Sequence, residues 1–175
     1  AFQRGDLAGA ERGFRQVLRK EPKNLGALNL LAVLLTAAQR FDEAEKYFIA
    51  VLRLDARSDA TFYNYGLVLK SLGRLDEALE RFSQALALNP RNGDSWNNRG
   101  TVLTLLSAHG RAIADFDQAL ALNPKDAAAI FNKGKALAEL KRHDEARAAY
   151  DAALTLRPDM AEAWYGLGVL ESGLK

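Results

Sequence analysis

Three asparagines recur at a constant interval along the chain, and their carboxamides are suited to binding a peptide backbone. Asn64, Asn98 and Asn132 are spaced 34 residues apart, and each is followed two residues later by Gly. A carboxamide has two donor hydrogens and an acceptor oxygen, so it can pair with both the N–H and the C=O groups of an extended segment. The column therefore favours a ladder of backbone-binding groups. Hydrogen bonding between neighbouring repeats or to water is the alternative.

Catalytic chemistry has little support in the sequence. His109 and His143 are the two histidines, they lie 34 residues apart, and the chain has no Cys. A metal site built on them would need further ligands at a suitable spacing, and a turn position before a helix explains both residues better. The sequence contains no phosphate-binding GxxxxGK stretch, no HExxH and no nucleophile-elbow serine. We therefore expect a non-catalytic segment without metal or cofactor.

The elements that must position the asparagines follow the same period of 34 residues. Pro22, Pro90, Pro124 and Pro158 fall on one lattice, which is broken at Ala56. Self-similarity of this length is the signature of a repeat architecture. Three further columns keep the period, one of small residues, one of alanine and one of aromatic rings: Ala32, Gly66, Gly100, Gly134 and Gly168; Ala10, Ala44, Ala78, Ala112 and Ala146; and Phe14, Phe48, Phe82, Phe116 and Tyr150.

One period predicts two amphipathic helices joined by a short turn. In residues 59–92 the apolar residues recur at steps of three and four on both sides of a break at Gly73, which is the spacing of a helix face packed on a core. We expect the small Gly66 and Ala78 to let the two backbones approach closely and to admit the large ring of Phe82.

Composition supports helices throughout. The chain has 31 Ala and 29 Leu, whereas Val, Ile and Thr together number 14, and this balance predicts an all-α fold. Lys and Arg number 24 against 22 Asp and Glu, the signs are interspersed, and nucleic acid is therefore not a favoured partner. The longest apolar run, Leu30 to Leu35, is far shorter than the roughly 20 residues of a membrane span. We expect no membrane association and a cytoplasmic location, with the periplasm as the alternative.

The periodic columns resemble the tetratricopeptide repeat. The resemblance implies an all-α, right-handed superhelical solenoid of antiparallel helix pairs, whose first helices line a concave groove. On this register residues 1–175 form a single array with partial repeats at 1–24 and 161–175. The full repeats would be 25–58, 59–92, 93–126 and 127–160. Since both ends fall within a repeat, we expect a fragment of a longer chain, in which apolar terminal helices stack into an end-to-end homodimer.

Helical spacing places further residues beside the asparagines on the face that the resemblance assigns to the groove. Packing between first helices is the alternative for its aromatic residues Tyr63, Phe131 and Tyr165. Arg99 is expected to pack its stem on the core and to direct its charge to water. The predicted peptide-binding residues are Asn29, Tyr63, Asn64, Asn97, Asn98, Thr101, Phe131, Asn132 and Lys135.

The sequence therefore predicts a scaffold or adaptor module whose partner is a protein or peptide. The asparagine column also resembles the ladder of O-linked N-acetylglucosamine transferases, which implies a second function, the substrate-recognition arm of such an enzyme. Self-assembly is a third. Some tetratricopeptide domains clamp acidic chaperone tails with Lys, Asn and Arg side chains. That clamp is not expected here, because Asp94 occupies one of its slots and would repel an acidic tail.

Overall fold

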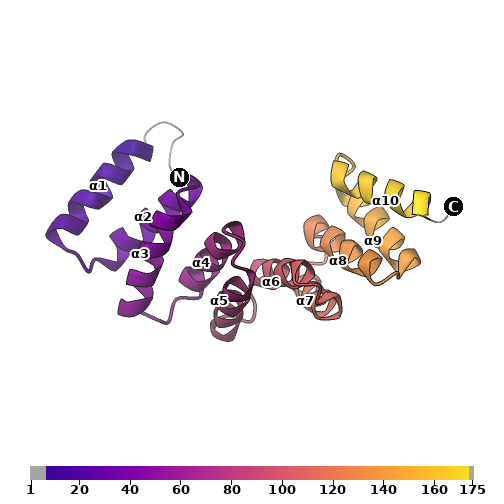
Figure 1. Ribbon diagram of the computed structural model, residues 1–175, viewed down its shortest axis with the longest axis horizontal. Coiled ribbons are helices and arrows are strands. Elements are labelled where there is room, and N and C mark those ends of the chain that lie inside the picture. Colours follow the sequence, from indigo (N-terminus) through magenta and orange to yellow (C-terminus); the bar gives the residue numbers. More distant parts are fainter. Residues whose placement is uncertain (1–6, 174–175) are drawn as a thin grey trace. The chain divides into compact units, whose positions relative to one another are not determined.

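The computed structural model describes residues 7–173, and within this range the chain is built from helices without strands (Figure 1). Residues 1–6 of the first predicted partial repeat, and 174–175 of the last, lie outside the described part. The all-α fold predicted from composition is confirmed. The helices are α1 (Leu7–Lys20), α2 (Leu25–Ala37), α3 (Phe41–Leu54), α4 (Asp59–Ser71), α5 (Leu75–Leu88), α6 (Gly93–Leu105), α7 (His109–Leu122), α8 (Ala127–Glu139), α9 (His143–Leu156) and α10 (Ala161–Gly173).

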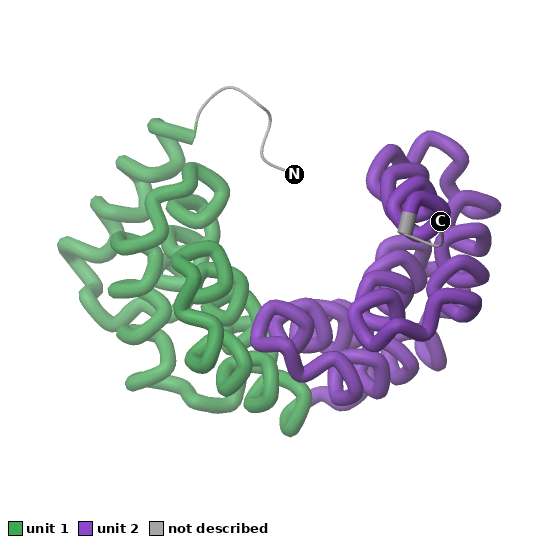
Figure 2. The backbone as a smooth tube through the Cα atoms, turned by 45° about the vertical axis from the view of Figure 1, so that its right-hand side comes forward, with its two compact units in different colours: residues 1–88 green, residues 89–175 purple. Residues whose placement is uncertain are grey.

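The helices divide into two compact units, residues 1–88 and 89–175 (Figure 2). In unit 1, α2 packs against α3 and α4 against α5, while α1 packs on α2. In unit 2, α6 pairs with α7 and α8 with α9, and α10 packs on α9 and α8. Each unit is therefore a stack of helical hairpins in which the first helices are neighbours.

A periodic cap begins four of the first helices. The side chains of Asn24, Ser58, Asn92 and Asp126 accept hydrogen bonds from backbone N–H groups in the first turns of α2, α4, α6 and α8. These caps satisfy amide hydrogens that have no partner within the helix. The repeating cap fixes where each hairpin starts.

The turn inside each hairpin requires one residue in the left-handed region of the backbone. Gln39, Gly73, Ser107 and Lys141 occupy equivalent positions and have φ values of 58, 73, 59 and 60°. This conformation ends a helix by turning the chain back on itself and is free of steric cost only for Gly. The break predicted at Gly73 is therefore a helix C-terminus of this kind.

Three of the four hairpins close on an aromatic ring that fits against a glycine, and in the α2–α3 hairpin the equivalent residue is Ala32. The rings of Phe82 and Phe116 are fully buried. A Cβ atom built on Gly66 would lie 2.8 Å from the Phe82 ring, and one on Gly100 would lie 2.7 Å from the Phe116 ring. Such distances are too short for an ordinary carbon contact, so these positions admit only Gly without movement. The expectation that small residues admit the ring is confirmed.

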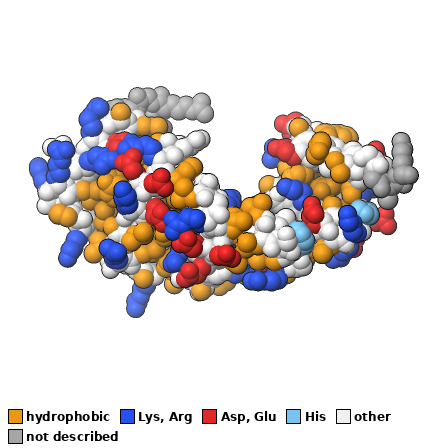
Figure 3. Space-filling model, viewed as in Figure 1, with side chains coloured by type: hydrophobic (Ala, Val, Ile, Leu, Met, Phe, Trp, Pro, Cys, Tyr) orange, Lys and Arg blue, Asp and Glu red, His pale blue; other side chains and the backbone are white. Residues whose placement is uncertain are grey.

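Ion pairs join successive hairpins of unit 1, where acidic and basic side chains lie next to one another (Figure 3). Arg40 binds Glu11 at 2.7 Å and Glu43 at 2.6 Å. Arg74 repeats this pattern one period later, with Glu45 at 2.7 Å and Glu77 at 2.6 Å. These guanidinium hydrogen bonds lower the pKa values of Glu11, Glu43 and Glu77.

A more buried pair joins the two helices of the α6–α7 hairpin in unit 2. The Arg99 guanidinium donates to both carboxylate oxygens of Asp115, at 2.7 and 2.8 Å, and Asp115 is only 5% exposed. The guanidinium also lies 4.6 Å from the centre of the Trp96 ring. The expectation that Arg99 directs its charge to water was therefore wrong, because a carboxylate on the facing helix satisfies it instead.

The glycine–ring contact gives a first prediction. Gly100→Ala should lower the free energy of unfolding by about 1–3 kcal/mol, because the new methyl group overpacks a buried ring. Gly168 is the matched control, since it belongs to the same column but a Cβ there would meet nothing within 4 Å. Gly168→Ala should raise stability by up to about 1 kcal/mol through helix propensity. Urea unfolding followed by circular dichroism measures both free energies of unfolding. Equal changes in the two variants would contradict a close contact between Gly100 and the Phe116 ring.

The buried ion pair gives a second prediction. Arg99→Leu should destabilise the chain by about 3 kcal/mol, since it leaves the Asp115 carboxylate buried without its partner. The double variant Arg99→Leu/Asp115→Ala should regain most of this loss, because it removes both charges. The free energies of unfolding of the two variants test this, and a double variant no more stable than the single one would refute it.

Candidate functional site

The predicted binding residues fall into two groups, one in each unit. Asn29 lies on α2, and Tyr63 and Asn64 lie on α4, all in unit 1. The larger group lies on the neighbouring helices α6 and α8 of unit 2. It consists of Asn97, Asn98, Thr101, Phe131, Asn132 and Lys135.

In unit 1 the predicted residues make contacts between helices. The Thr61 hydroxyl lies 3.2 Å from Asn29 Oδ1 and donates to it, which joins α4 to α2. The Tyr63 ring lies 6.0 Å from the Phe82 ring, centre to centre. The half-buried Asn64 carboxamide has no hydrogen-bond partner among the described residues. Of this group, Asn64 has the side chain with the most unused hydrogen-bonding capacity.

In unit 2 the asparagines use part of their hydrogen-bonding capacity within the protein. Asn132 Nδ2 donates to Asn97 Oδ1 at 3.1 Å and lies 3.5 Å from Thr101 Oγ1, and these contacts join α8 to α6. Asn98 Nδ2 donates to the backbone oxygen of Asp94 at 2.9 Å. Bonding between repeats, the alternative to the ladder, therefore occurs at Asn132. The Asn132 carbonyl oxygen has no partner among the described residues.

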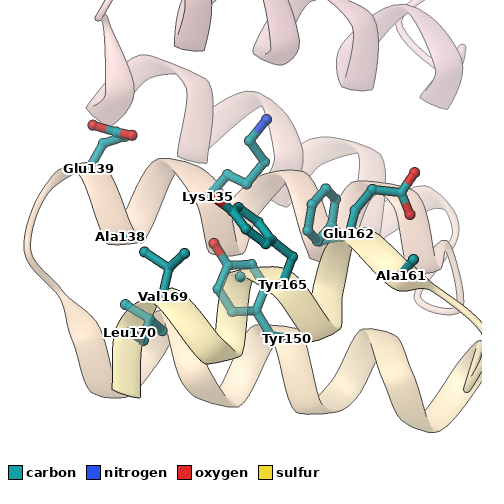
Figure 4. A pocket seen from close by; sticks show the side chains of 11 residues that line it. Lys135, Ala138, Glu139, Tyr150, Ala161, Glu162, Tyr165, Val169 and Leu170 are labelled. Carbon is teal, nitrogen blue, oxygen red and sulfur yellow. The ribbon is translucent and has the colours of Figure 1, made fainter. Parts of the chain in front are cut away.

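We call the surface that carries Asn98, Thr101, Asn132 and Lys135 the inner face of unit 2. Thr101, Asn132 and Lys135 line one small cavity of about 40 Å³. Lys135 also lies on the rim of a much larger pocket, which opens between α8 and α10 and has a volume of about 570 Å³ (Figure 4). This volume is within the range of small-molecule binding pockets, about 300–1,000 Å³.

Two glycines shape the large pocket around Tyr150, whose ring forms its floor. A Cβ on Gly134 would lie 2.7 Å from one edge of the ring, and a Cβ on Gly166 would lie 2.9 Å from the other. Gly166 occupies the slot that holds Asn98 and Asn132 in the preceding repeats. A side chain at this position would displace the ring or fill the pocket. The pocket is therefore open because Gly166 stands where the two preceding repeats have an asparagine.

The pocket walls are apolar and aromatic. The Phe131 ring lies 5.6 Å from the Tyr150 ring, and Lys135 Nζ lies 5.9 Å from the centre of Phe131. Tyr165 is 76% exposed and lines the opening together with Val169. An exposed aromatic side chain beside a concave apolar surface is suited to contact with a partner.

The floor of the pocket carries one polar group, the Tyr150 hydroxyl. Burial, followed by the charge of Glu139, raises the pKa of Tyr150. The hydroxyl therefore stays protonated at neutral pH, able to donate and accept one hydrogen bond. The equivalent residues Phe14, Phe48, Phe82 and Phe116 have no such group, so this floor is particular to the last hairpin.

Two of the predicted peptide-binding residues, Phe131 and Lys135, line the large pocket, and so does Tyr165, which the sequence places on the same face. The remaining lining residues were not predicted as part of a site. The most informative of these are Tyr150 and Gly166. Both carry a signal in the sequence, because each departs from its own column: Tyr replaces Phe, and Gly replaces Asn.

The described residues contain no group of three or more His, Cys, Asp or Glu side chains that could hold a metal ion. His109 and His143 are the first residues of α7 and α9, as expected for turn positions. Within the described part, no helix combines the length and the apolar character that crossing a membrane requires.

Comparison with solved structures identifies the architecture. A structure of MamA superposes with a TM-score of 0.84 at 24% identity, over 90% of this chain and 92% of that one. YrrB, described as a TPR protein with an unusual peptide-binding site, gives 0.77 at 28% identity, over 91% and 82%. The first TPR of Spaghetti (RPAP3), bound to the HSP90 peptide SRMEEVD, gives 0.65 at 26% identity, over 69% and 95%.

Comparison by sequence agrees with this result. No curated protein sequence matches the chain significantly. Two family models, both described as tetratricopeptide repeat, do match it. One matches residues 63–127, 107–161 and 131–171, and the other matches residues 24–91. Since these regions together cover most of the sequence, the chain belongs to the tetratricopeptide repeat family.

Proposed function

We propose that the chain is a protein-interaction module that binds an extended peptide segment on the inner face of unit 2. The pocket between α8 and α10 carries this proposal, because it combines apolar walls with a single hydroxyl at its floor. Binding of peptides by the related YrrB and RPAP3 domains supports it. Scaffolding, a glycosyltransferase arm and self-association are narrower alternatives that the sequence suggests.

In this proposal the pocket takes one bulky apolar side chain, and the asparagines beside it bind the backbone of the segment. The Asn132 carbonyl can accept a backbone N–H while its amide group stays bonded to Asn97. A fixed carboxamide loses little conformational entropy on binding, because the contact to α6 already orders it. Asn132 therefore acts both in packing and in recognition.

The pocket wall can be tested by substitution. Tyr165→Ala should reduce the affinity for peptides selected from a random library against the full chain by about 10-fold, since exposed aromatic side chains dominate many interfaces. Stability should change by less than about 0.5 kcal/mol, because the side chain is largely exposed. Trp164→Ala is the matched control, an aromatic residue on the same helix that is 58% exposed but does not line the pocket. Equal effects of the two variants would exclude the pocket as the site.

The asparagines can be tested separately. Asn98→Ala/Asn132→Ala should weaken binding of the same peptides roughly 10-fold, since each hydrogen bond contributes about 0.5–1.5 kcal/mol. Asn97→Ala is the control, because it removes the hydrogen bond from Asn132 Nδ2 to Asn97 Oδ1 while keeping both proposed ligands of the backbone. If Asn97→Ala weakens binding equally, the asparagines act by holding the helices together and not by binding the peptide.

A further inference from the structure

The charged side chains on the first helices of unit 2 separate into paired and unpaired groups. The paired residues reach the second helices: Arg99 binds Asp115 at 2.7 Å, Lys133 binds Asp117 at 2.6 Å, and Glu171 binds Arg147 at 3.3 Å. The unpaired residues, which have no ion-pair partner among the described residues, are Asp94, Lys135, Glu139 and Glu162. Three of these four charges are negative.

Two of the unpaired carboxylates flank the large pocket. Glu139 is the last residue of α8, and Glu162 lies in the first turn of α10. Figure 4 shows them on opposite sides of the aromatic rings of Tyr150 and Tyr165, and both line the pocket. A ligand that fills the centre of the pocket therefore has a carboxylate near each end.

The positive charge of Lys135 lies on the pocket rim between the two carboxylates (Figure 4). Its ammonium group faces the Phe131 ring, 5.9 Å from the ring centre. A cation on the ligand would be repelled at this central position and attracted at the two ends. The centre, with its aromatic and aliphatic walls, suits an uncharged bulky side chain.

The third unpaired carboxylate, Asp94, adds a further negative charge to the inner face. Asp94 precedes Asn98 by one helical turn on α6, so the two lie on the same side of that helix. It occupies the same repeat position as Glu162. A segment running from the pocket past Asn132 and Asn98 would therefore meet another negative charge.

From this arrangement we propose that the pocket between α8 and α10 selects a peptide in which a bulky apolar residue is flanked on both sides by Lys or Arg. The proposal rests on the proposed function, since it assigns a ligand class to the same pocket. It also distinguishes this chain from the RPAP3 domain, whose peptide SRMEEVD carries two adjacent Glu and an Asp. An acidic segment would meet three carboxylates on the inner face and one ammonium group.

The test uses the full chain and fluorescently labelled peptides with a central Phe in a Ser and Ala background. The Phe is flanked on both sides by Arg, by Gln or by Glu, and anisotropy titration gives the dissociation constants. We expect the Arg peptide to bind about 10-fold more tightly than the Gln peptide at low salt, and the Glu peptide and SRMEEVD to bind most weakly. Raising the salt concentration should reduce these differences in affinity between the peptides, because salt screens exposed charges.

Variants assign the preference to particular residues. Glu139→Gln/Glu162→Gln should remove the preference, so that the dissociation constants of the Arg and Gln peptides become about equal. Lys135→Gln should strengthen binding of the Arg peptide about threefold. Asp151→Asn, which removes an exposed acid on α9, is the matched control and should have no effect.

The outcomes separate this proposal from the one on which it rests. Equal binding of the Arg and Gln peptides, or a preference that survives in Glu139→Gln/Glu162→Gln, would overturn the charge selection while leaving the pocket as a peptide site. If none of the peptides binds, the proposed function itself fails, and the charge selection fails with it.

Discussion

The contact between a glycine on the first helix and an aromatic ring on the second is the constraint on which three of the four hairpins of this protein depend. Gly66 and Gly100 bring the backbone of one helix within van der Waals reach of a fully buried ring on the other. Such a contact has no room for adjustment, because protein interiors are close-packed and a single methyl group is felt. The crossing of the helices, and hence which side chains face outward, follows from this contact.

The candidate site results from local departures within that constraint. In the last complete hairpin the ring is Tyr150, and its second edge faces Gly166 on α10. The ring is nearly as buried as its phenylalanine equivalents, yet it carries a hydroxyl and lies beneath an open pocket. A repeat protein can therefore acquire a binding site by changing two positions, while the packing that holds its helices stays the same.

The fold could be predicted almost entirely from the sequence, because each helix and turn is repeated. A helix boundary that is ambiguous in one repeat is indicated by the equivalent residues of the others. The site could be predicted only in part. The period predicts Asn132 as a peptide-binding residue, but its bond to Asn97 depends on how far apart α6 and α8 lie, which periodicity does not specify. The partnership of Arg99 with Asp115 was missed for a similar reason. The two residues lie in different columns, and no neighbouring hairpin repeats the pair.

The turn residues of the hairpins have a consequence for how the chain folds. Gln39, Ser107 and Lys141 hold the left-handed backbone conformation with a side chain present, whereas Gly73 adopts it without steric cost. Closing the α4–α5 hairpin therefore requires less conformational free energy than closing the others, all of which have turns of similar length. Because repeat arrays fold by local nucleation and growth onto neighbours, the α4–α5 hairpin is the natural starting point from which helical structure spreads.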